Sequence, residues 1–255
     1  MDKLKIIISG GGTGGHIFPA VSIADEFRSR FPGCDILFVG ALGRMEMEKV
    51  PRAGYPISGL PVMGFPRKPG FKTLLFMVRL AQSLLKARKI VKAFKPDIAI
   101  GVGGFASGPL LRAATALNIP SLIQEQNSYA GKTNKWLAPK AGCICVAYEG
   151  MDRYFPKEKI VVTGNPVRKE LFDISHSREE ACRWFQLPGQ GKTLLITGGS
   201  LGARTLNNAV LSNLDQFRES GNSLLWQTGS LYFREMQEKT SGRLSGNIRM
   251  VEFID

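Results

Sequence analysis

The stretch that decides the fold is Lys5-Ile-Ile-Ile-Ser-Gly-Gly-Gly-Thr-Gly-Gly-His-Ile-Phe-Pro19. Its β-branched run, residues 6–8, is typical of a strand that is buried on both faces of a parallel sheet. Glycines fill residues 10–15 except for Thr13, and Pro19 suits the first turn of a helix, where its missing N–H costs nothing. Bare backbone lets an anion approach the unpaired N–H groups at a helix N-terminus. The segment therefore predicts a phosphate-binding turn between a strand and a helix.

The same order of features occurs twice more. Residues 96–101 predict a strand that runs into the loop at 101–109, and residues 193–197 predict a strand that runs into the loop at 198–203. Glycines allow tight turns in any doubly wound sheet, so one such loop carries little weight. Three loops favour a phosphate or sugar ligand. Each of them carries a hydroxyl side chain: Thr13, Ser107 and Ser200.

Strands alternate with helices along the whole chain, which predicts an open parallel α/β sheet. The strands are expected at 3–9, 35–39, 97–101, 120–124, 142–147, 159–163, 193–197, 223–227 and 247–251. The helices are expected at 18–30, 73–94, 106–117, 130–138, 202–218 and 230–240. The turn-rich stretch 163–168 suits a linker. We therefore expect two domains, 1–164 and 165–255, the second holding the first strands of a doubly wound domain and stopping before it is complete.

Composition excludes several classes of protein. The net charge of +13 and the pI of about 9.8 point to a polyanionic partner, namely nucleic acid, an anionic membrane or a phosphorylated substrate. No apolar run is long enough to predict a membrane span, and we expect no signal peptide. The four cysteines form no CxxC pair, so free thiols in a reducing cytoplasm are expected rather than zinc.

Two nucleotide-binding motifs are present in part, but the residues around them do not fit the nucleotides that these motifs bind. Gly10, Gly12 and Gly15 satisfy GxGxxG, but the next strand ends in Val39-Gly40 without the carboxylate that would hold an NAD ribose. Gly191-Lys192-Thr193 is similar to a P-loop, but its lysine precedes the strand instead of following it. We expect no cofactor.

Taken in order, the motifs resemble the MurG family of bacterial N-acetylglucosaminyltransferases. The resemblance runs along essentially the whole chain and is carried by 10–19, 101–109, Glu125-Gln-Asn127, Ala130-Gly131, 133–136, 163–168 and 198–204. It implies the GT-B fold, in which two Rossmann-like domains face each other across a cleft. It also implies transfer of GlcNAc from UDP-GlcNAc to the MurNAc 4-hydroxyl of lipid I, the undecaprenyl-pyrophosphate-linked MurNAc-pentapeptide, to give lipid II for peptidoglycan.

The resemblance also implies site residues. Donor contacts are expected at Thr13, Gly14, Gly15, Asn127, Arg168, Ser200 and Ile254. The acceptor side of the site is expected to include Gly103, Gly104, Ser107 and Asn134. Arg168 can neutralise diphosphate charge, and Asn127 offers a donor and an acceptor to a sugar hydroxyl.

The catalytic candidates are His16 and Glu125, for a single in-line displacement with inversion. His16 closes the first glycine loop next to a helix N-terminus, whose dipole disfavours protonation, and a base must be neutral. Either His16 is the base, or it only hydrogen-bonds the loop or an acceptor phosphate. Glu125 is either a rival base or the group that orients Asn127. His176 is expected at the surface near a helix start, and no Asp-x-Asp occurs, so no metal is expected.

The sequence departs from the family at three places. Gln124 replaces a common His, and Leu201 replaces a common Gln, from which we expect tuning of activity. The family's later segments, which hold uracil, ribose and GlcNAc, would follow Asp255. We therefore expect these 255 residues alone to bind donor poorly and turn over little.

Residues 67–95 combine many Lys and Arg residues with aliphatic side chains and contain no Asp or Glu. This pattern is typical of a basic amphipathic helix on anionic lipid, although an ordinary packed helix with a solvated face also fits it. Phe71, Lys72, Leu75 and Arg79 are the expected membrane contacts. The expected location is the cytoplasmic face of the inner membrane, as a peripheral protein.

Two other functions remain in view. Another GT-B glycosyltransferase with a different lipid acceptor would carry the same loops. A nucleic-acid binder would explain the charge, but it would interleave aromatic rather than aliphatic side chains with the basic ones. We therefore expect no nucleic-acid partner.

Overall fold

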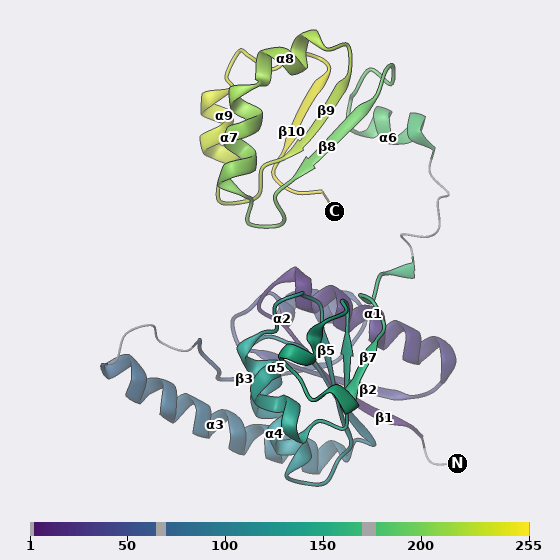
Figure 1. Cartoon of the computed structure of the whole chain (residues 1–255), viewed down its shortest axis with the longest axis vertical. Coiled ribbons are helices and arrows are strands. Elements are labelled where there is room, and N and C mark those ends of the chain that lie inside the picture. Colours follow the sequence, from purple (N-terminus) through teal and green to yellow (C-terminus); the bar gives the residue numbers. More distant parts are fainter. Residues whose placement is uncertain (1–2, 65–69, 170–176, 255) are drawn as a thin grey trace. The chain divides into compact units, whose positions relative to one another are not determined.

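The computed structural model describes residues 3–64, 70–169 and 177–254. The chain divides into two compact units, Met1–Phe172 and Asp173–Asp255 (Figure 1). This division lies a short way C-terminal to the expected domain boundary at 164/165. Each unit is built on its own parallel sheet.

The sheet of the first unit has seven strands in the order β3-β2-β1-β4-β5-β6-β7, every neighbouring pair parallel. The strands are β1 Lys5–Gly10, β2 Asp35–Ala41, β3 Ile57–Leu60, β4 Ile98–Gly103, β5 Ser121–Glu125, β6 Cys143–Val146 and β7 Ile160–Val162. Strand order reverses between β1 and β4. In doubly wound sheets, ligands bind beside this reversal, at the carboxyl ends of the strands.

Helices cover both faces of this sheet. They are α1 Gly14–Arg30, α2 Glu46–Arg52, α3 Phe71–Phe94, α4 Ser107–Thr115 and α5 Lys132–Leu137, with 3-10 turns η1 Ala138–Lys140, η2 Met151–Arg153 and η3 Lys157–Lys159. Ile6 and Ile8 belong to the core formed with α1 and α2, whereas Ile7 belongs to the core formed with α3 and α4. Successive side chains of a strand point to opposite faces, which explains why the run is apolar at every position.

The first helix begins earlier than expected. The Thr13 carbonyl accepts from the N–H groups of His16 and Ile17, both at 3.1 Å, so α1 starts at Gly14 and not near residue 18. Pro19 therefore lies inside α1, in its second turn, and the prediction that it opens the helix is wrong. His16 belongs to the first turn of α1.

Some elements of the described chain were not predicted. β3, α2 and α6 have no counterpart among the expected strands and helices. The expected helix at 202–218 is two helices, because Asn213 Nδ2 donates to the Ala209 carbonyl at 2.8 Å and closes the first of them.

The second unit has the strand order β10-β9-β8, also parallel. Its elements are α6 Arg178–Trp184, β8 Thr193–Thr197, α7 Arg204–Ser212, α8 Leu214–Glu219, β9 Ser223–Gln227, α9 Phe233–Lys239 and β10 Ile248–Val251. Trp226 of β9 is fully buried among residues of α7, α9 and β10. Its indole N–H donates to Asn207 Oδ1 at 2.9 Å, and Asn207 Nδ2 donates to the Thr228 carbonyl at 2.9 Å. This buried amide joins α7 to β9.

Candidate functional site

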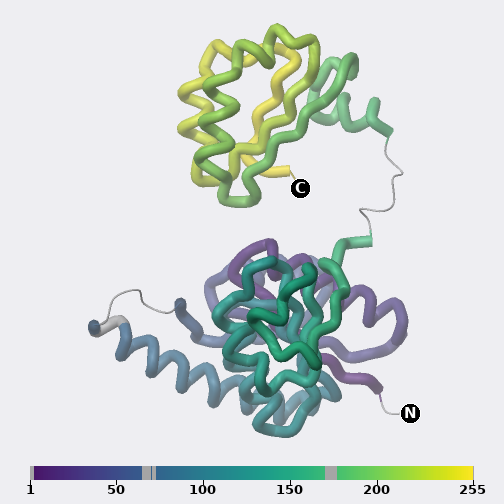
Figure 2. The backbone as a smooth tube through the Cα atoms, in the orientation of Figure 1, coloured from purple at the N-terminus to yellow at the C-terminus, as the bar shows by residue number. Residues whose placement is uncertain are grey.

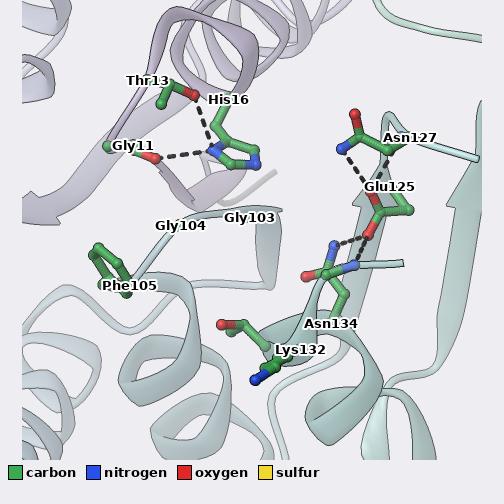
Figure 3. A pocket seen from close by; sticks show the side chains of 13 residues that line it. Gly11, Thr13, His16, Gly103, Gly104, Phe105, Glu125, Asn127, Lys132 and Asn134 are labelled. Atoms are coloured by element: carbon green, nitrogen blue, oxygen red, sulfur yellow. Dashed lines mark hydrogen bonds between the residues drawn. The ribbon is translucent and has the colours of Figure 1, made fainter. Parts of the chain in front are cut away.

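A pocket of about 320 Å³ opens at the carboxyl ends of β1, β4 and β5, where the strand order of the first unit reverses (Figure 3). Backbone from two glycine loops and polar side chains from β5 and α5 line it. The lining residues are Gly11, Gly12, Thr13, His16, Gly103, Gly104, Phe105, Glu125, Asn127, Gly131, Lys132, Thr133 and Asn134.

The two glycine loops of this pocket touch each other through backbone. Gly104 has φ +89°, and a Cβ added there would lie 2.4 Å from the Gly11 carbonyl oxygen. A Cβ at Gly103, which has φ +106°, would lie 2.6 Å from Cδ2 of His16. Both positions therefore require glycine for conformation and for space.

His16 enters this pocket from the first turn of α1. Its Nδ1 lies 3.0 Å from the Gly11 carbonyl oxygen and 3.5 Å from Thr13 Oγ1. A carbonyl oxygen only accepts, so Nδ1 must carry the proton. In the neutral ring, Nε2 then keeps its lone pair. Figure 3 shows this second nitrogen pointing away from Gly11.

A buried carboxylate, absent from the sequence predictions, holds the first glycine loop. Glu46 of α2 is 1% exposed. Its Oε2 accepts from the Gly12 N–H at 2.9 Å, and its Oε1 accepts from the Ala41 N–H at 2.9 Å. It therefore ties the end of β2 to the loop after β1.

Glu125 accepts four N–H groups. Its Oε1 accepts from the backbone N–H and the side-chain Nδ2 of Asn127, both at 3.1 Å. Its Oε2 accepts from Gly131 N and Asn134 Nδ2, both at 2.9 Å. Each oxygen is thus already used by two donors, which favours the orienting role over that of a base.

The structure brings together most of the predicted residues of the first unit. Thr13, His16, Gly103, Gly104, Glu125, Asn127 and Asn134 all line the pocket. Gly14 and Gly15 form the adjoining start of α1.

Ser107 does not belong with the pocket residues. Its side chain is fully buried, and Oγ lies 2.8 Å from the Gly103 carbonyl and 3.0 Å from the Ser9 carbonyl, to which it donates. This hydroxyl joins β1 to β4, and the place of Ser107 on the acceptor side stays a prediction.

Arg168 lies outside the pocket lining. It is exposed, and its guanidinium lies 4.9 Å from the centre of the Phe18 ring on α1. The next residue, Lys169, pairs with Glu26 of α1 at 2.8 Å. These contacts hold residues 168 and 169 against α1, and the role of Arg168 on a diphosphate stays a prediction.

The second unit carries the third glycine loop, after β8. Gly202 has φ +87°, and a Cβ there would lie 2.1 Å from the Thr228 carbonyl oxygen, so this loop also touches its neighbour through backbone. The Ser200 carbonyl accepts from Ser230 N at 3.1 Å. Ile254 is partly buried against the cluster that contains Cys182 and Leu225. Their donor contacts stay predictions.

Six lining residues were not among the predicted site residues, and Lys132 and Phe105 are two of them. Lys132 is an exposed cation at the start of α5, and Phe105 is 45% exposed in the loop after β4. Phe105 stands inside the loop at 101–109, and Lys132 lies between the motifs Ala130-Gly131 and 133–136. Only the folded sheet brings the two into the pocket that His16 lines. In the described ranges, no three His, Cys, Asp or Glu side chains gather as a metal site requires.

Helix α3 exposes much of its apolar surface. Ser83, Ala87 and Val91 form its buried stripe, while Leu74 is 62% exposed and Leu85 is 65% exposed. Figure 2 shows α3 as a long straight segment whose N-terminal end extends beyond the rest of the first unit. The side chains of Phe71 and Lys72, and the whole of His176, lie outside the described part of the chain. None of the helices described has the length and apolar character needed to cross a bilayer.

Comparisons with known proteins agree with this geometry. The glycosyltransferase family 28 N-terminal domain matches residues 6–146, and the family's C-terminal domain matches residues 193–255. Two curated relatives carry the name UDP-N-acetylglucosamine–N-acetylmuramyl-(pentapeptide) pyrophosphoryl-undecaprenol N-acetylglucosamine transferase. The Phocaeicola vulgatus protein is 57% identical over 254 residues, covering 100% of this chain and 67% of the relative. The Parabacteroides distasonis protein is 59% identical over 235 residues, covering 92% and 64%.

Solved structures show the same fold. The crystal structure of Acinetobacter baumannii MurG matches with a TM-score of 0.67 and 27% identity, over 99% of this chain and 67% of that one. A UDP-GlcNAc 2-epimerase from Neisseria meningitidis matches with a TM-score of 0.66 at 15% identity, over 98% and 73%, which bears on the fold alone. The chain thus spans about two thirds of the length of these proteins. It has the α/β GT-B fold and belongs to glycosyltransferase family 28, in its MurG group.

Proposed function

We propose that this protein transfers GlcNAc from UDP-GlcNAc to the MurNAc 4-hydroxyl of lipid I, giving lipid II and UDP. The observation that carries the proposal is the pocket at the β1–β4 reversal, with His16, Asn127 and Lys132 around its backbone floor. The names of relatives at 57% and 59% identity supply the substrates. The first unit is the acceptor domain, and the second contributes the start of the UDP-GlcNAc domain.

The chemistry needs a base and positive potential. The MurNAc hydroxyl oxygen attacks C1 of GlcNAc with inversion, its proton passes to the base, and UDP leaves with the electron pair of the C1–O bond. His16 is the base, because Nδ1 donates to Gly11 and leaves Nε2 to take a proton. Such help is typically worth about 10²–10⁴-fold in rate. Arg168 and the loop N–H groups supply the positive potential for the leaving diphosphate.

The lipid part of the acceptor fits a second cavity that adjoins the first. This cavity holds about 510 Å³ and shares Phe105, Lys132 and Thr133 with the glycine pocket. The rest of its lining is mostly apolar: Val62, Met63, Phe76, Leu80, Gly108, Pro109 and Trp136. A polyprenyl chain with an anionic head group would place its pyrophosphate near Lys132 and its first isoprene units in the apolar cavity.

Helix α3 provides the membrane contact in this proposal. Leu74, Leu75 and Leu85 are exposed on it beside the exposed cations Arg79 and Lys86. Each cation near an anionic surface contributes about 1 kcal/mol. Adsorption at the cytoplasmic face of the inner membrane would bring the acceptor pocket to the bilayer that holds its lipid.

Turnover tests the proposal directly. The 255-residue chain, and the same chain fused to the C-terminal third of the Phocaeicola vulgatus relative, are incubated with labelled UDP-GlcNAc and lipid I. We expect the fusion to produce lipid II. Its His16→Asn variant, which lacks the proposed base, should lose about 10²–10⁴-fold in rate. Turnover on another lipid acceptor with none on lipid I would instead establish a different glycosyltransferase.

Sedimentation with liposomes tests the membrane contact. Leu74→Asp together with Leu85→Asp should abolish salt-sensitive binding to anionic vesicles. Leu231→Asp is the matched control, because Leu231 is 66% exposed but lies in the second unit. If the α3 variant and the Leu231→Asp control bind anionic vesicles equally well, the proposal that α3 contacts the membrane is refuted.

A further inference from the structure

One peptide group lies between Glu46 and His16. The Gly12 N–H and the Gly11 C=O belong to the same peptide bond and point in opposite directions. Glu46 Oε2 accepts from that N–H at 2.9 Å, and His16 Nδ1 donates to that carbonyl at 3.0 Å. The carboxylate and the imidazole are thus joined in one line of hydrogen bonds through backbone.

We propose that Glu46 is a positioning residue that acts through the Gly11–Gly12 peptide to hold His16 in its Nδ1–H tautomer. A carboxylate that accepts an amide N–H polarises the peptide and makes its carbonyl a stronger acceptor, because hydrogen bonds in a chain strengthen one another. The stronger carbonyl then favours the proton on Nδ1.

The burial of Glu46 and its hydrogen-bond partners support this role. The side chain is 1% exposed, and its described partners are two backbone N–H groups rather than a cation. Backbone packs closely around the Glu46 side chain. A Cβ at Gly11 would lie 2.2 Å from Glu46 Oε1, and one at Gly40 would lie 2.6 Å from Glu46 Cγ.

The consequence for catalysis rests on the proposed function. If His16 is the base, Nε2 must carry the lone pair, and the tautomer held by Glu46 provides it. A carboxylate that orients a histidine usually contacts the ring directly. Here a peptide group stands between them, which keeps the negative charge of Glu46 away from an anionic ligand.

The tautomer can be measured without any substrate. The ¹⁵N chemical shifts of the imidazole nitrogens distinguish Nδ1–H from Nε2–H, read at about pH 8.5, where an ordinary histidine is neutral. The chain has two histidines, so the His176→Gln variant assigns the signals. We expect the Nδ1–H form to dominate for His16 in the wild-type chain. A dominant Nε2–H form would overturn the proposal.

Two variants then isolate the carboxylate. In Glu46→Gln, the amide NH₂ must face one of the two N–H donors, so we expect the ratio of Nδ1–H to Nε2–H to fall about threefold. Glu48→Gln on the same helix is the matched control, since Glu48 is 62% exposed and its carboxylate pairs with Arg52. An unchanged ratio in folded Glu46→Gln would overturn the proposal.

A further measurement does not depend on the folding of a variant. Scalar couplings across hydrogen bonds in the wild-type chain should connect Gly12 N with the Glu46 carboxyl carbon and His16 Nδ1 with the Gly11 carbonyl carbon. Absence of either coupling breaks the proposed line. None of these readouts requires turnover, so a failure on lipid I would refute the proposed function and leave the link between Glu46 and His16 intact.

Discussion

Replacing Gly104 by alanine should destabilise the first unit more than replacing Gly12 does. Both glycines have a left-handed φ, +89° and +87°. An L side chain in that region costs about 1–2 kcal/mol. At Gly104 the new Cβ would also lie 2.4 Å from the Gly11 carbonyl oxygen, whereas nothing lies within 4 Å of it at Gly12.

The contact sets the difference between the two variants. Overpacking against groups that cannot move costs about 1–3 kcal/mol. We therefore expect Gly104→Ala to lose about 2–5 kcal/mol of the free energy of unfolding and Gly12→Ala to lose about 1–2 kcal/mol. Typical domains have about 5–15 kcal/mol in total.

Hydrogen exchange of the β1 and β4 amides, followed by mass spectrometry, reports on the first unit alone. In the regime where exchange follows the opening equilibrium, Gly104→Ala should exchange about 5- to 150-fold faster than Gly12→Ala. If the two variants exchange at the same rate, the backbone contact between the loops contributes nothing, and the reasoning about the pocket floor fails.

Three further outcomes follow from buried polar groups and thiols. Glu125→Gln should lose about 2–4 kcal/mol of unfolding free energy in denaturant, because an amide NH₂ then faces N–H donors; a loss below about 0.5 kcal/mol would show that the four contacts are replaceable. Asn207→Ala should lose a similar amount from the second unit, read by hydrogen exchange of the β9 amides, since the Trp226 indole N–H and the Thr228 carbonyl lose their partner. Burial, with Cys143 beside it, raises the pKa of Cys145 to about 11. The thiolate is therefore scarce near pH 8, and iodoacetamide should label Cys145 faster with each pH unit up to about 11; a plateau by pH 9 would contradict this.

The sequence predicted the parts of the fold that depend on local pattern. Apolar runs that end in glycine identified β1, β4 and β8, and each of these strands does lead into a glycine turn and a helix. Elements held mainly by long-range pairing were missed. β3 is a four-residue edge strand containing Gly59, and it exists because it pairs with β2 from Phe38 to Ala41. Glycine has a low propensity for strands, so the local sequence did not predict β3.

The same distinction applies to the site. Thr13, His16 and Asn127 belong to motifs whose chemistry can be inferred from the sequence, and all three line the pocket. Ser107 was assigned from its hydroxyl and its place in a glycine loop, and neither reveals that the hydroxyl is buried within hydrogen-bonding distance of two carbonyl oxygens. Glu46 was missed because its partners, Gly12 in the loop after β1 and Ala41 at the end of β2, meet it only after the sheet forms.

The floor of the glycine pocket consists largely of main chain, and this has a consequence for inhibition. A compound that hydrogen-bonds to the peptide groups of Gly11, Gly103 and Gly104 would contact backbone atoms, and a substitution does not remove these. A resistance mutation there would have to add a side chain. Because the two loops lie so close together, the added side chain would clash with its neighbours and destabilise the first unit. Escape from such a compound would therefore have to arise at lining positions that already carry a side chain, such as Phe105 or Lys132.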